Sequence, residues 1–153
     1  MEERTLVLVK PLGVKRGLIG KIIDRFERAG LRLFGLKMMR MDEALAYSHY
    51  EAHTNEPFFP TLLQYMTSGP IVGMVVEGDD AIARVRDLMG GTNPANALPG
   101  TLRADYAIDT TRNLVHGSDS LESARREIAL FFGPDELYHY ERVVDPRVDN
   151  SEA

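Results

Sequence analysis

The sequence contains no cysteine, so neither a disulfide framework nor thiol chemistry is available to this chain. No apolar run approaches the roughly 18 residues that a membrane-spanning helix needs. The first residues, Met1-Glu2-Glu3-Arg4, carry charge where a signal peptide would be apolar. We therefore expect a soluble cytoplasmic protein that makes no use of a membrane.

The usual glycine-rich phosphate loops are also missing. No stretch matches the Walker pattern G-x-x-x-x-G-K-[ST] or the dinucleotide pattern G-x-G-x-x-G. The net charge of −5 argues against a nucleic-acid-binding surface. It does not argue against a nucleotide, because a small pocket needs only a few convergent cations.

The length of 153 residues predicts a single domain, and 44% hydrophobic residues are enough to fill its core. We find no internal repeat and no linker. Residues 142–153 are rich in charge and include Pro146, so we expect a C-terminal extension there rather than core.

Hydrophobic periodicity and turn residues divide the chain into ten segments. In order, we expect a strand at 5–9, a helix at 18–26 ended by Gly30, a strand at 31–41, a helix capped by Asp42 that runs to about 53, a helical segment at 57–66, a strand at 71–77, a helix from Asp79 or Asp80 to 89, a long loop at 92–111, a helix at 121–126 and a strand at 128–132. This order of two βαβ-like halves predicts an α/β (α+β) protein. The expected fold is a ferredoxin-like sandwich, a four-stranded antiparallel sheet with helices packed on it and the long loop just before His116.

His116 lies among residues that are unusual in combination. Gly117 follows it, where the backbone must turn tightly or something must approach closely. Asp119 with Glu122 predicts a capping box, which places His116 just before a helix N-terminus, where anions bind. Two interpretations stay open on residue types alone. His116 is either a partly buried loop histidine beside a helix cap, or a nucleophile, base or ligand.

Residues 113–119, NLVHGSD, closely resemble the active-site signature of the nucleoside diphosphate kinases, in which Asn and two aliphatic residues precede His-Gly-Ser-Asp. Further matches follow in the family order at Lys10-Pro11, Gly13-Val14, Arg16-Gly17, 57–60, 68–70, 92–95 and 99–101, so the resemblance covers roughly residues 3–140. It implies the ferredoxin-like fold. It also implies transfer of the γ-phosphoryl group from a nucleoside triphosphate to a nucleoside diphosphate, by a ping-pong mechanism through phospho-His116.

The resemblance also implies the residues of the site. The catalytic residues would be His116, Glu127, Ser118, Tyr50 and Lys10. The nucleotide-binding residues would be Lys10, Phe58, Leu62, Arg86, Thr92, Arg103, Thr110, Asn113 and His53. In this scheme Arg86, Thr92 and Arg103 hold the phosphates, which His53 also faces. The base stacks on Phe58, with Leu62 nearby and Thr110 opposite. Lys10 and Asn113 reach the ribose hydroxyls.

The orienting carboxylate of this scheme is Glu127, which would hold the His116 ring with help from Ser118. We expect Glu127 at the end of the helix at 121–126, with the chain returning to the sheet through the strand at 128–132. The ordinary alternative for each charged residue of the scheme, taken singly, is a solvated side chain; this holds for Lys10, Arg86, Arg103 and Glu127.

His49 and His53 are four residues apart, the spacing of a two-histidine metal site on a helix. No cysteine, no H-E-x-x-H pattern and no third ligand accompanies them, so we do not expect a structural metal there. Magnesium is expected to arrive with the nucleotide, held mostly by phosphate oxygens. No residue is expected to bind it directly, although Asp119 could contact it through water.

The chain departs from the family pattern at three places. Leu12 stands where the family has an acidic residue, and Ala104 and Thr111 stand where it often has glycine. These changes put local loop geometry and the stability of the assembly in doubt. The family forms hexamers and tetramers from a shared dimer, so we expect a homo-oligomer, with a hexamer ahead of a tetramer. Its other partners would be nucleoside triphosphates and diphosphates. The alternative to an enzyme is a non-catalytic nucleotide-binding or scaffold protein on the same fold.

Overall fold

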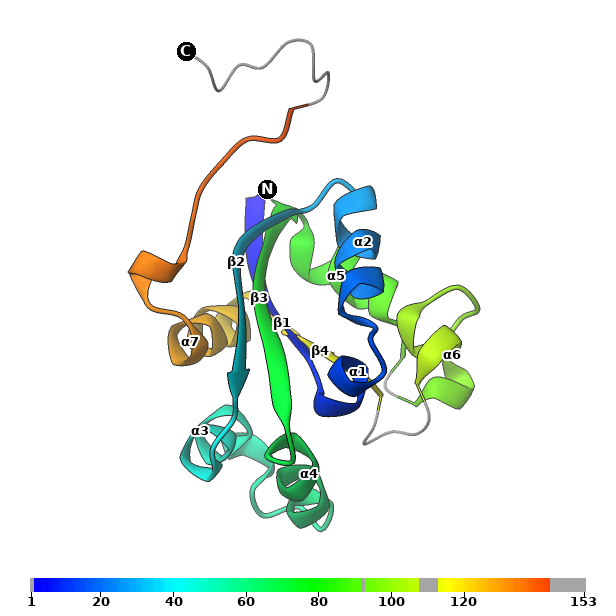
Figure 1. The fold of residues 1–153 in the computed structure, drawn as a ribbon, viewed down its shortest axis with the longest axis vertical. Helices are drawn as coiled ribbons and strands as arrows, with labels where there is room; N and C mark the ends of the chain where they lie inside the picture. Colours follow the sequence, from blue (N-terminus) through cyan, green and yellow to red (C-terminus); the bar gives the residue numbers. More distant parts are fainter. Residues whose placement is uncertain (1, 92, 108–112, 144–153) are drawn as a thin grey trace.

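The computed structural model describes residues 2–91, 93–107 and 113–143 (Figure 1). Its elements, in chain order, are β1 (Glu2–Val9), α1 (Pro11–Lys15), α2 (Ile19–Arg28), β2 (Arg32–Arg40), α3 (Glu43–His49), the 3-10 helix η1 (Glu51–His53), α4 (Phe59–Met66), β3 (Pro70–Asp79), α5 (Ala81–Met89), η2 (Pro94–Asn96), α6 (Leu102–Tyr106), β4 (Val115–Gly117), α7 (Leu121–Phe131) and η3 (Pro134–Glu136). Among these residues, no helix is both long and apolar enough to cross a membrane.

The four strands form one antiparallel sheet in the order β2-β3-β1-β4, as the ferredoxin-like prediction requires. The inner strand β1 is buried continuously from Thr5 to its end, so its sequence reads as an apolar run without alternation. That pattern arises because helices cover both faces of the sheet (Figure 1).

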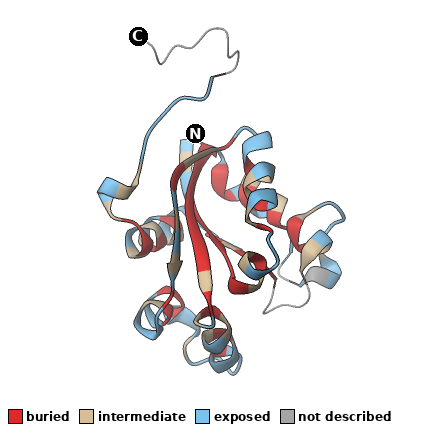
Figure 2. Cartoon of the chain, viewed as in Figure 1, coloured by how far each residue is buried: buried red, intermediate tan, exposed pale blue. Residues whose placement is uncertain are grey.

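Two hydrophobic cores lie on opposite faces of the sheet (Figure 2). Val7 and Val9 of β1 pack with α2 and α5, whereas Leu6 and Leu8 pack with α3, α4 and the end of α7. This split follows the alternation of side chains along a strand. Residues of β4 obey the same rule, because β4 pairs with β1. Alternate positions of β4 therefore face α5 on one side and the α3–α7 layer on the other.

The fourth strand was predicted in the wrong place. Residues 128–132 were expected to be a strand, but α7 runs from Leu121 to Phe131. Its buried residues are Ala124, Glu127 and Phe131, which repeat at helical spacing, and a short apolar run alone does not distinguish a strand from a buried helix. The actual fourth strand is β4, only three residues long and too short to show a period.

The segment at 92–111 was also predicted incorrectly, as a loop without helices. It contains η2 and the five-residue helix α6, which begins after Thr101, whose hydroxyl accepts a hydrogen bond from the backbone N–H of Ala104. Leu102 and Arg103 are buried, so packing rather than helix periodicity holds this turn in place. Thr92, Thr110 and Thr111 lie outside the described residues.

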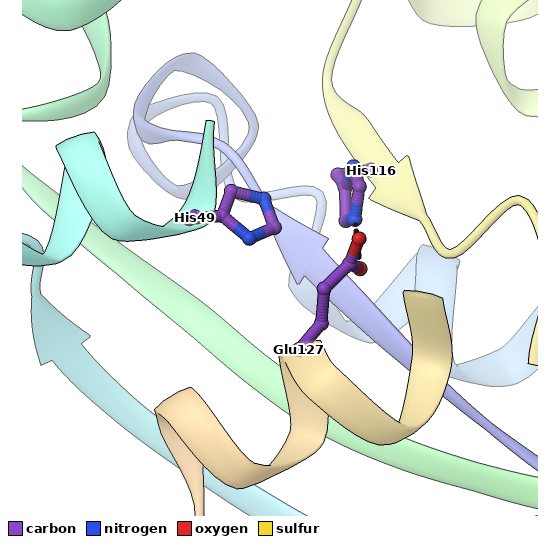
Figure 3. A group of neighbouring side chains, drawn as sticks. All are labelled: His49, His116 and Glu127. Atoms are coloured by element: carbon purple, nitrogen blue, oxygen red, sulfur yellow. Dashed lines mark hydrogen bonds and ion pairs between the residues drawn. The ribbon is translucent and has the colours of Figure 1, made fainter. Parts of the chain in front are cut away.

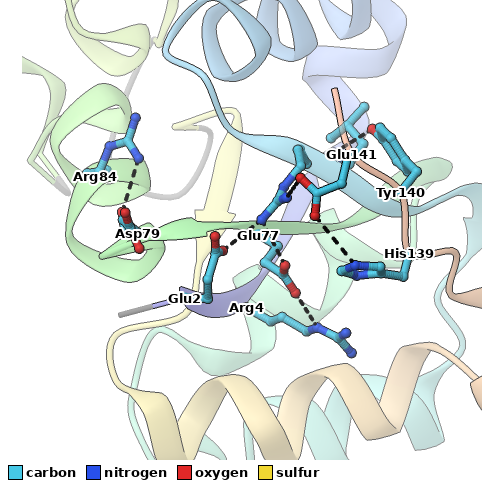
Figure 4. Close-up of polar contacts among 10 residues, drawn as sticks. Glu2, Arg4, Glu77, Asp79, Arg84, His139, Tyr140 and Glu141 are labelled. Atoms are coloured by element: carbon cyan, nitrogen blue, oxygen red, sulfur yellow. Dashed lines mark hydrogen bonds and ion pairs between the residues drawn. The ribbon is translucent and has the colours of Figure 1, made fainter. Parts of the chain in front are cut away.

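The chain after η3 runs back along the outer strand β2 (Figure 4). We call residues 137–142 the C-terminal strap. Its backbone and side chains bind groups on β2: the N–H of Tyr138 donates to the carbonyl oxygen of Phe34, and the hydroxyl of Tyr140 accepts from the N–H of Leu33. Glu141 forms an ion pair with Arg32 at 3.0 Å. The strap therefore covers the first part of β2. Residues 144–153 of the predicted extension lie outside the described residues.

Candidate functional site

The strand β4 fixes the position of His116. Leu8 of β1 pairs with His116, and the N–H of Lys10 donates to the carbonyl oxygen of Leu114 at 2.7 Å. His116 therefore faces the α3–α7 layer, while its neighbour Gly117 faces α5 on the opposite side. A Cβ at Gly117 would lie 2.7 Å from the sulfur of Met89, so a larger residue here would force that side chain of α5 to shift.

His116, Glu127 and Ser118 form one hydrogen-bonded chain, of which Figure 3 shows the contact between His116 and Glu127. The Nε2 atom of His116 lies 2.7 Å from Oε1 of Glu127, and the Ser118 hydroxyl donates to the same oxygen at 2.9 Å. Ser118 in turn accepts a hydrogen bond from the backbone N–H of Leu6 in β1. These are the contacts expected from the sequence, although the topological reason given for them was wrong. Glu127 reaches His116 from within α7, which packs against β1 beside β4.

The N-terminus of α7 also differs from the prediction. The cap is Ser120, whose hydroxyl accepts from the N–H of Ser123, so the expected capping box at Asp119 does not form. Asp119 lies one residue earlier, at the edge of the pocket. A hydrogen bond from Ser123 and the nearby charge of Arg86 help to lower the pKa of the Asp119 carboxyl. Asp119 is therefore available as an ionised group beside the histidine.

The protonation of the His116 ring follows from its contact with Glu127. Burial disfavours the charge on Glu127, but hydrogen bonds from His116 and Ser118 and nearby charges outweigh this effect, so the pKa of Glu127 is lowered. An ionised carboxylate only accepts hydrogen bonds, which means that Nε2 of His116 carries the proton. In a neutral ring Nδ1 then holds a lone pair and can act as a nucleophile.

His116 opens into a pocket of about 700 Å³, within the usual size range for a ligand site. It brings together most of the residues expected from the sequence: Lys10, Tyr50, His53, Phe58, Leu62, Arg86, Arg103, Asn113, His116, Asp119 and Glu127. Ser118 is fully buried behind Glu127 and does not line the pocket. Thr92 and Thr110 lie outside the described residues.

Three cations converge on this pocket. Arg86 donates to the carbonyl oxygen of Gly117, and Arg103 donates to those of Gly90 and Val115, so both arginines also hold β4 in place. Burial, followed by the charge of Arg86, lowers the pKa of Arg103 to about 10. Burial, followed by the charge of Arg103, lowers the pKa of Lys10 to about 7. Such crowding of positive charge favours a ligand that carries several negative charges.

The buried Lys10 should make stability depend on pH. Its charged form is the protonated one, and its folded pKa of about 7 lies below the ordinary lysine value of 10.5. The full cost of burying the charge is therefore present below pH 7 and disappears as the pH rises toward 10.5. Lys10→Met should raise the thermal midpoint of the nucleotide-free protein, and by more at pH about 6 than at pH about 9. Calorimetry at both pH values checks this expectation. An equal rise at both would mean that Lys10 stays protonated in the folded protein over this range, so that its pKa is not lowered.

The opposite wall of the pocket comes from α3, η1 and α4. Phe58 is 48% exposed at the start of α4, and its ring lies 5.8 Å from that of His53, whereas Leu62 is buried beneath it. An exposed aromatic face over an apolar floor suits the stacking of a nucleotide base. Tyr50 is buried, and its hydroxyl has no hydrogen-bond partner among the described residues. Burial is the main cause that raises the pKa of this hydroxyl, so it remains a hydrogen-bond donor.

Sequence reasoning missed the two ionisable pocket residues His49 and Arg126. His49 is 4% exposed, and its ring packs edge-on against that of His116 with 4.7 Å between the centroids. Arg126 donates to the carbonyl oxygens of Ser48 and His49 at 2.9 and 3.1 Å, which ties the end of α3 to α7. The sequence offered one signal, that His49 directly precedes Tyr50. Its spacing from His53 is instead typical of a two-histidine metal site on a helix.

An α/β sandwich with a histidine facing a cation-lined pocket defines a class of proteins that handle phosphorylated ligands. Comparison with known sequences gives the family: residues 3–137 match the family model described as nucleoside diphosphate kinase. The chain belongs to the nucleoside diphosphate kinase family.

Individual relatives are similar over nearly the full chain. The nucleoside diphosphate kinase of Listeria monocytogenes serotype 4a (strain HCC23) is 56% identical over 143 residues, which cover 94% of this chain and 97% of the relative. A structure of the halophilic nucleoside diphosphate kinase of Halobacterium salinarum in complex with CDP has a TM-score of 0.90 and 52% identity, covering 93% of this chain and 95% of that one. The Aquifex aeolicus nucleoside diphosphate kinase has a TM-score of 0.87 and 42% identity, covering 90% and 99%.

Proposed function

We propose that this protein transfers the γ-phosphoryl group of a nucleoside triphosphate to a nucleoside diphosphate through phospho-His116. Membership of the family supports phosphoryl transfer between nucleotides. The residue-level proposal rests on one observation. Glu127 holds the ring of His116, and His116 opens into the cation-lined pocket. The non-catalytic alternative is disfavoured, because a binding protein has no need for a histidine whose proton is fixed by a buried carboxylate.

In the first half-reaction, Nδ1 of His116 attacks the γ-phosphorus. The new P–N bond forms as the bond from the γ-phosphorus to the β-bridging oxygen breaks, and the nucleoside diphosphate leaves with the electron pair. Glu127 holds the Nε2 proton and stabilises the positive charge that develops on the ring. Lys10, Arg86 and Arg103 stabilise the phosphoryl oxygens, since catalysis of this step is mostly positioning and electrostatics. A second nucleoside diphosphate then reverses the process.

The bound nucleotide would be held at its base, sugar and phosphates. Phe58 supplies a stacking face, with Leu62 beneath it, and Thr110 is proposed opposite. Lys10 and Asn113 are proposed to reach the ribose hydroxyls, and His53 and Thr92 to face the phosphates. Tyr50 would donate its hydroxyl, which has no partner among the described residues, toward the phosphoryl group on His116. Stacking accepts every base, which supports a broad range of nucleotides.

Members of this family work with a divalent cation. We propose that the cation here is Mg²⁺ and that it enters with the nucleotide phosphates, which suit its preference for oxygen ligands. Asp119 fits a contact through water, because its carboxyl is ionised and lines the pocket. Bound in this way, Mg²⁺ would neutralise charge on the phosphates and leave the protein groups to position His116.

Initial-rate kinetics test the proposal. Varying one nucleotide at several fixed concentrations of the other should give parallel double-reciprocal lines, because the phosphorylated protein separates the two half-reactions. Incubation with ATP alone should leave an acid-labile, base-stable phosphate on the chain. Intersecting lines would show direct transfer in a ternary complex and overturn the phospho-histidine mechanism.

We further propose that the protein acts in the cytoplasm as a homo-oligomer built from dimers, a hexamer or a tetramer. The strand β2 is an edge of the sheet, and the C-terminal strap covers only its first part. Beyond the strap, Leu36 and Met38 are 53% and 60% exposed. An open edge with exposed apolar side chains is suited to pairing with a second copy.

Met38→Lys should disrupt that pairing and convert the assembly to smaller species, because it places a charge on each side of the interface. Light scattering coupled to size exclusion measures the result. Leu121→Lys is the matched control, since Leu121 is also exposed and apolar but lies on α7. If Met38→Lys leaves the mass unchanged, β2 is not the dimer edge.

A further inference from the structure

Three side chains with metal-binding atoms meet beside the pocket (Figure 3). They are His49 at the end of α3, His116 in β4 and Glu127 in α7, and one ligand atom of each lies within 4.8 Å of the others. Among the described residues, no other three histidine, cysteine, aspartate or glutamate side chains come together in this way. The expected pair of His49 with His53 does not form part of the group.

His49 is the unexplained member of the group. It is 4% exposed, and neither of its ring nitrogens has a hydrogen-bond partner among the described residues. Buried polar atoms are nearly always paired, so two unpaired nitrogens on one side chain require an explanation. The ring is directed toward His116 and Glu127 (Figure 3). The steps of phosphoryl transfer described above make no use of it.

We propose that His49, His116 and Glu127 form a binding site for Zn²⁺ in the nucleotide-free protein, and that the bound metal inactivates His116. Two imidazoles and one carboxylate are a common ligand set for zinc, with water from the pocket as the fourth ligand. Mg²⁺ prefers oxygen ligands and would not compete for two imidazoles. The site therefore discriminates between the cation that accompanies the substrate and a transition metal that blocks the nucleophile.

The geometry needs only small movements of side chains. Zinc bonds of about 2.0–2.2 Å place tetrahedral ligand atoms about 3.3 Å apart. Nε2 of His116 and Oε1 of Glu127, now 2.7 Å apart, would separate slightly, and the His49 ring would move toward them. The metal would replace the proton on Nε2 of His116, and the ring, which stays neutral, would carry its proton on Nδ1 instead.

Loss of this hydrogen bond explains the inactivation. In the metal-bound state Glu127 no longer accepts from Nε2, so it cannot stabilise charge that develops on the ring. With the metal on Nε2, the neutral ring carries its proton on Nδ1, so that atom has no free lone pair with which to attack the γ-phosphorus. Zinc should therefore slow phosphorylation of His116 even when Mg²⁺ and nucleotide are in excess.

Calorimetric titration with ZnCl₂, without nucleotide, Mg²⁺ or chelator, tests the site directly. The wild-type chain should bind one Zn²⁺. His49→Gln should weaken binding at least about tenfold, since even outer-shell changes at metal sites cost that much. His139→Gln is the matched control. His139 is 64% exposed, with a carboxylate of Glu141 3.8 Å away, and its loss should leave the affinity unchanged. Absence of saturable binding, or equal affinity of His49→Gln and wild type, would overturn the proposal.

A second measurement covers the case in which His49→Gln is poorly folded. Zn²⁺ should raise the thermal midpoint of the wild type and shift the ring resonances of His49 and His116, but not those of His53 or His139. Shifts confined to exposed histidines would contradict the site.

Single-turnover phosphorylation then tests the inactivation. Zinc should slow the wild type by a larger factor than it slows His49→Gln, each compared with its own rate without zinc. An equal factor in both would mean that zinc acts on the nucleotide, and the inhibitory part of the proposal would be wrong. The binding titration contains no nucleotide, so its result is independent of the proposed function.

Discussion

His116→Ala should abolish both nucleotide-dependent phosphorylation of the chain and phosphoryl transfer, with a loss of at least about 10⁴-fold. Among the residues that the structure describes, we find no second nucleophile placed to replace it. His49 is the nearest imidazole, but burial lowers its pKa to about 3, and its ring is enclosed by Tyr50, His116 and Phe131. Incubation with labelled ATP, followed by treatment of the labelled protein with acid and with base, measures the acid-labile, base-stable phosphate on the chain. A coupled assay measures phosphoryl transfer.

The fold should survive this substitution. Backbone hydrogen bonds to β1 hold β4, and they do not depend on the imidazole. Glu127 would keep its hydrogen bond from Ser118. His139→Ala removes an exposed histidine that does not line the pocket and serves as the control, with activity equal to wild type. If His116→Ala still acquired acid-labile phosphate, the nucleophile would be another residue.

Glu127→Ala should slow phosphorylation of His116 by on the order of 10²-fold, the value of a well-positioned acid–base partner. The carboxylate fixes the proton on Nε2, keeps the lone pair on Nδ1 and opposes the charge that develops on the ring. Without it the two tautomers would compete and the ring would lose its 2.7 Å contact. The variant should still become phosphorylated, because the nucleophile itself remains.

Glu127→Gln should be milder than Glu127→Ala, since an amide oxygen accepts the Nε2 proton but carries no charge. Rapid quenching of a single turnover separates this effect from nucleotide binding. Glu122→Ala, on the same helix but outside the pocket lining, is a matched control for loss of a carboxylate. Wild-type rates in both Glu127 variants would show that Glu127 does not assist the reaction of His116.

Local sequence signals predicted the elements that are marked by a long apolar run or by a capping residue. The buried strands β1 and β3 show long apolar runs, Asp42 caps α3 through the N–H of Leu45, and Gly30 follows α2 with a φ of 86°. The strand β4 and the helix α6 escaped prediction, because elements of three and five residues are stabilised by tertiary contacts rather than by a periodic pattern. The end of α7 was mistaken for a strand because residues 128–132 form a short apolar run, and such a run alone does not distinguish a strand from a helix.

The residues of the candidate site were also predictable only in part. The motif around His116 and the resemblance to the family predicted the residues that line the pocket, whereas their roles remain predictions. His49 and Arg126 could not be predicted, because their importance comes from neighbours that are distant in sequence. The departure at Leu12 is accommodated in α1, where its N–H donates to the Tyr65 hydroxyl, and Ala104 fits the first turn of α6.

The pairing of β1 with β4 has a consequence for synthesis. The bond from Leu6 N–H to the Ser118 hydroxyl joins residues 112 positions apart, and Glu127 lies further along the chain. At the usual rates of translation, the ribosome needs on the order of ten seconds to make that interval. During this time β1 can pair with β3, but its other edge stays open and no nucleophile is present. Catalytic competence should therefore appear abruptly, after translation has passed α7, and nascent chains that stop earlier should be inert and prone to pair through that edge.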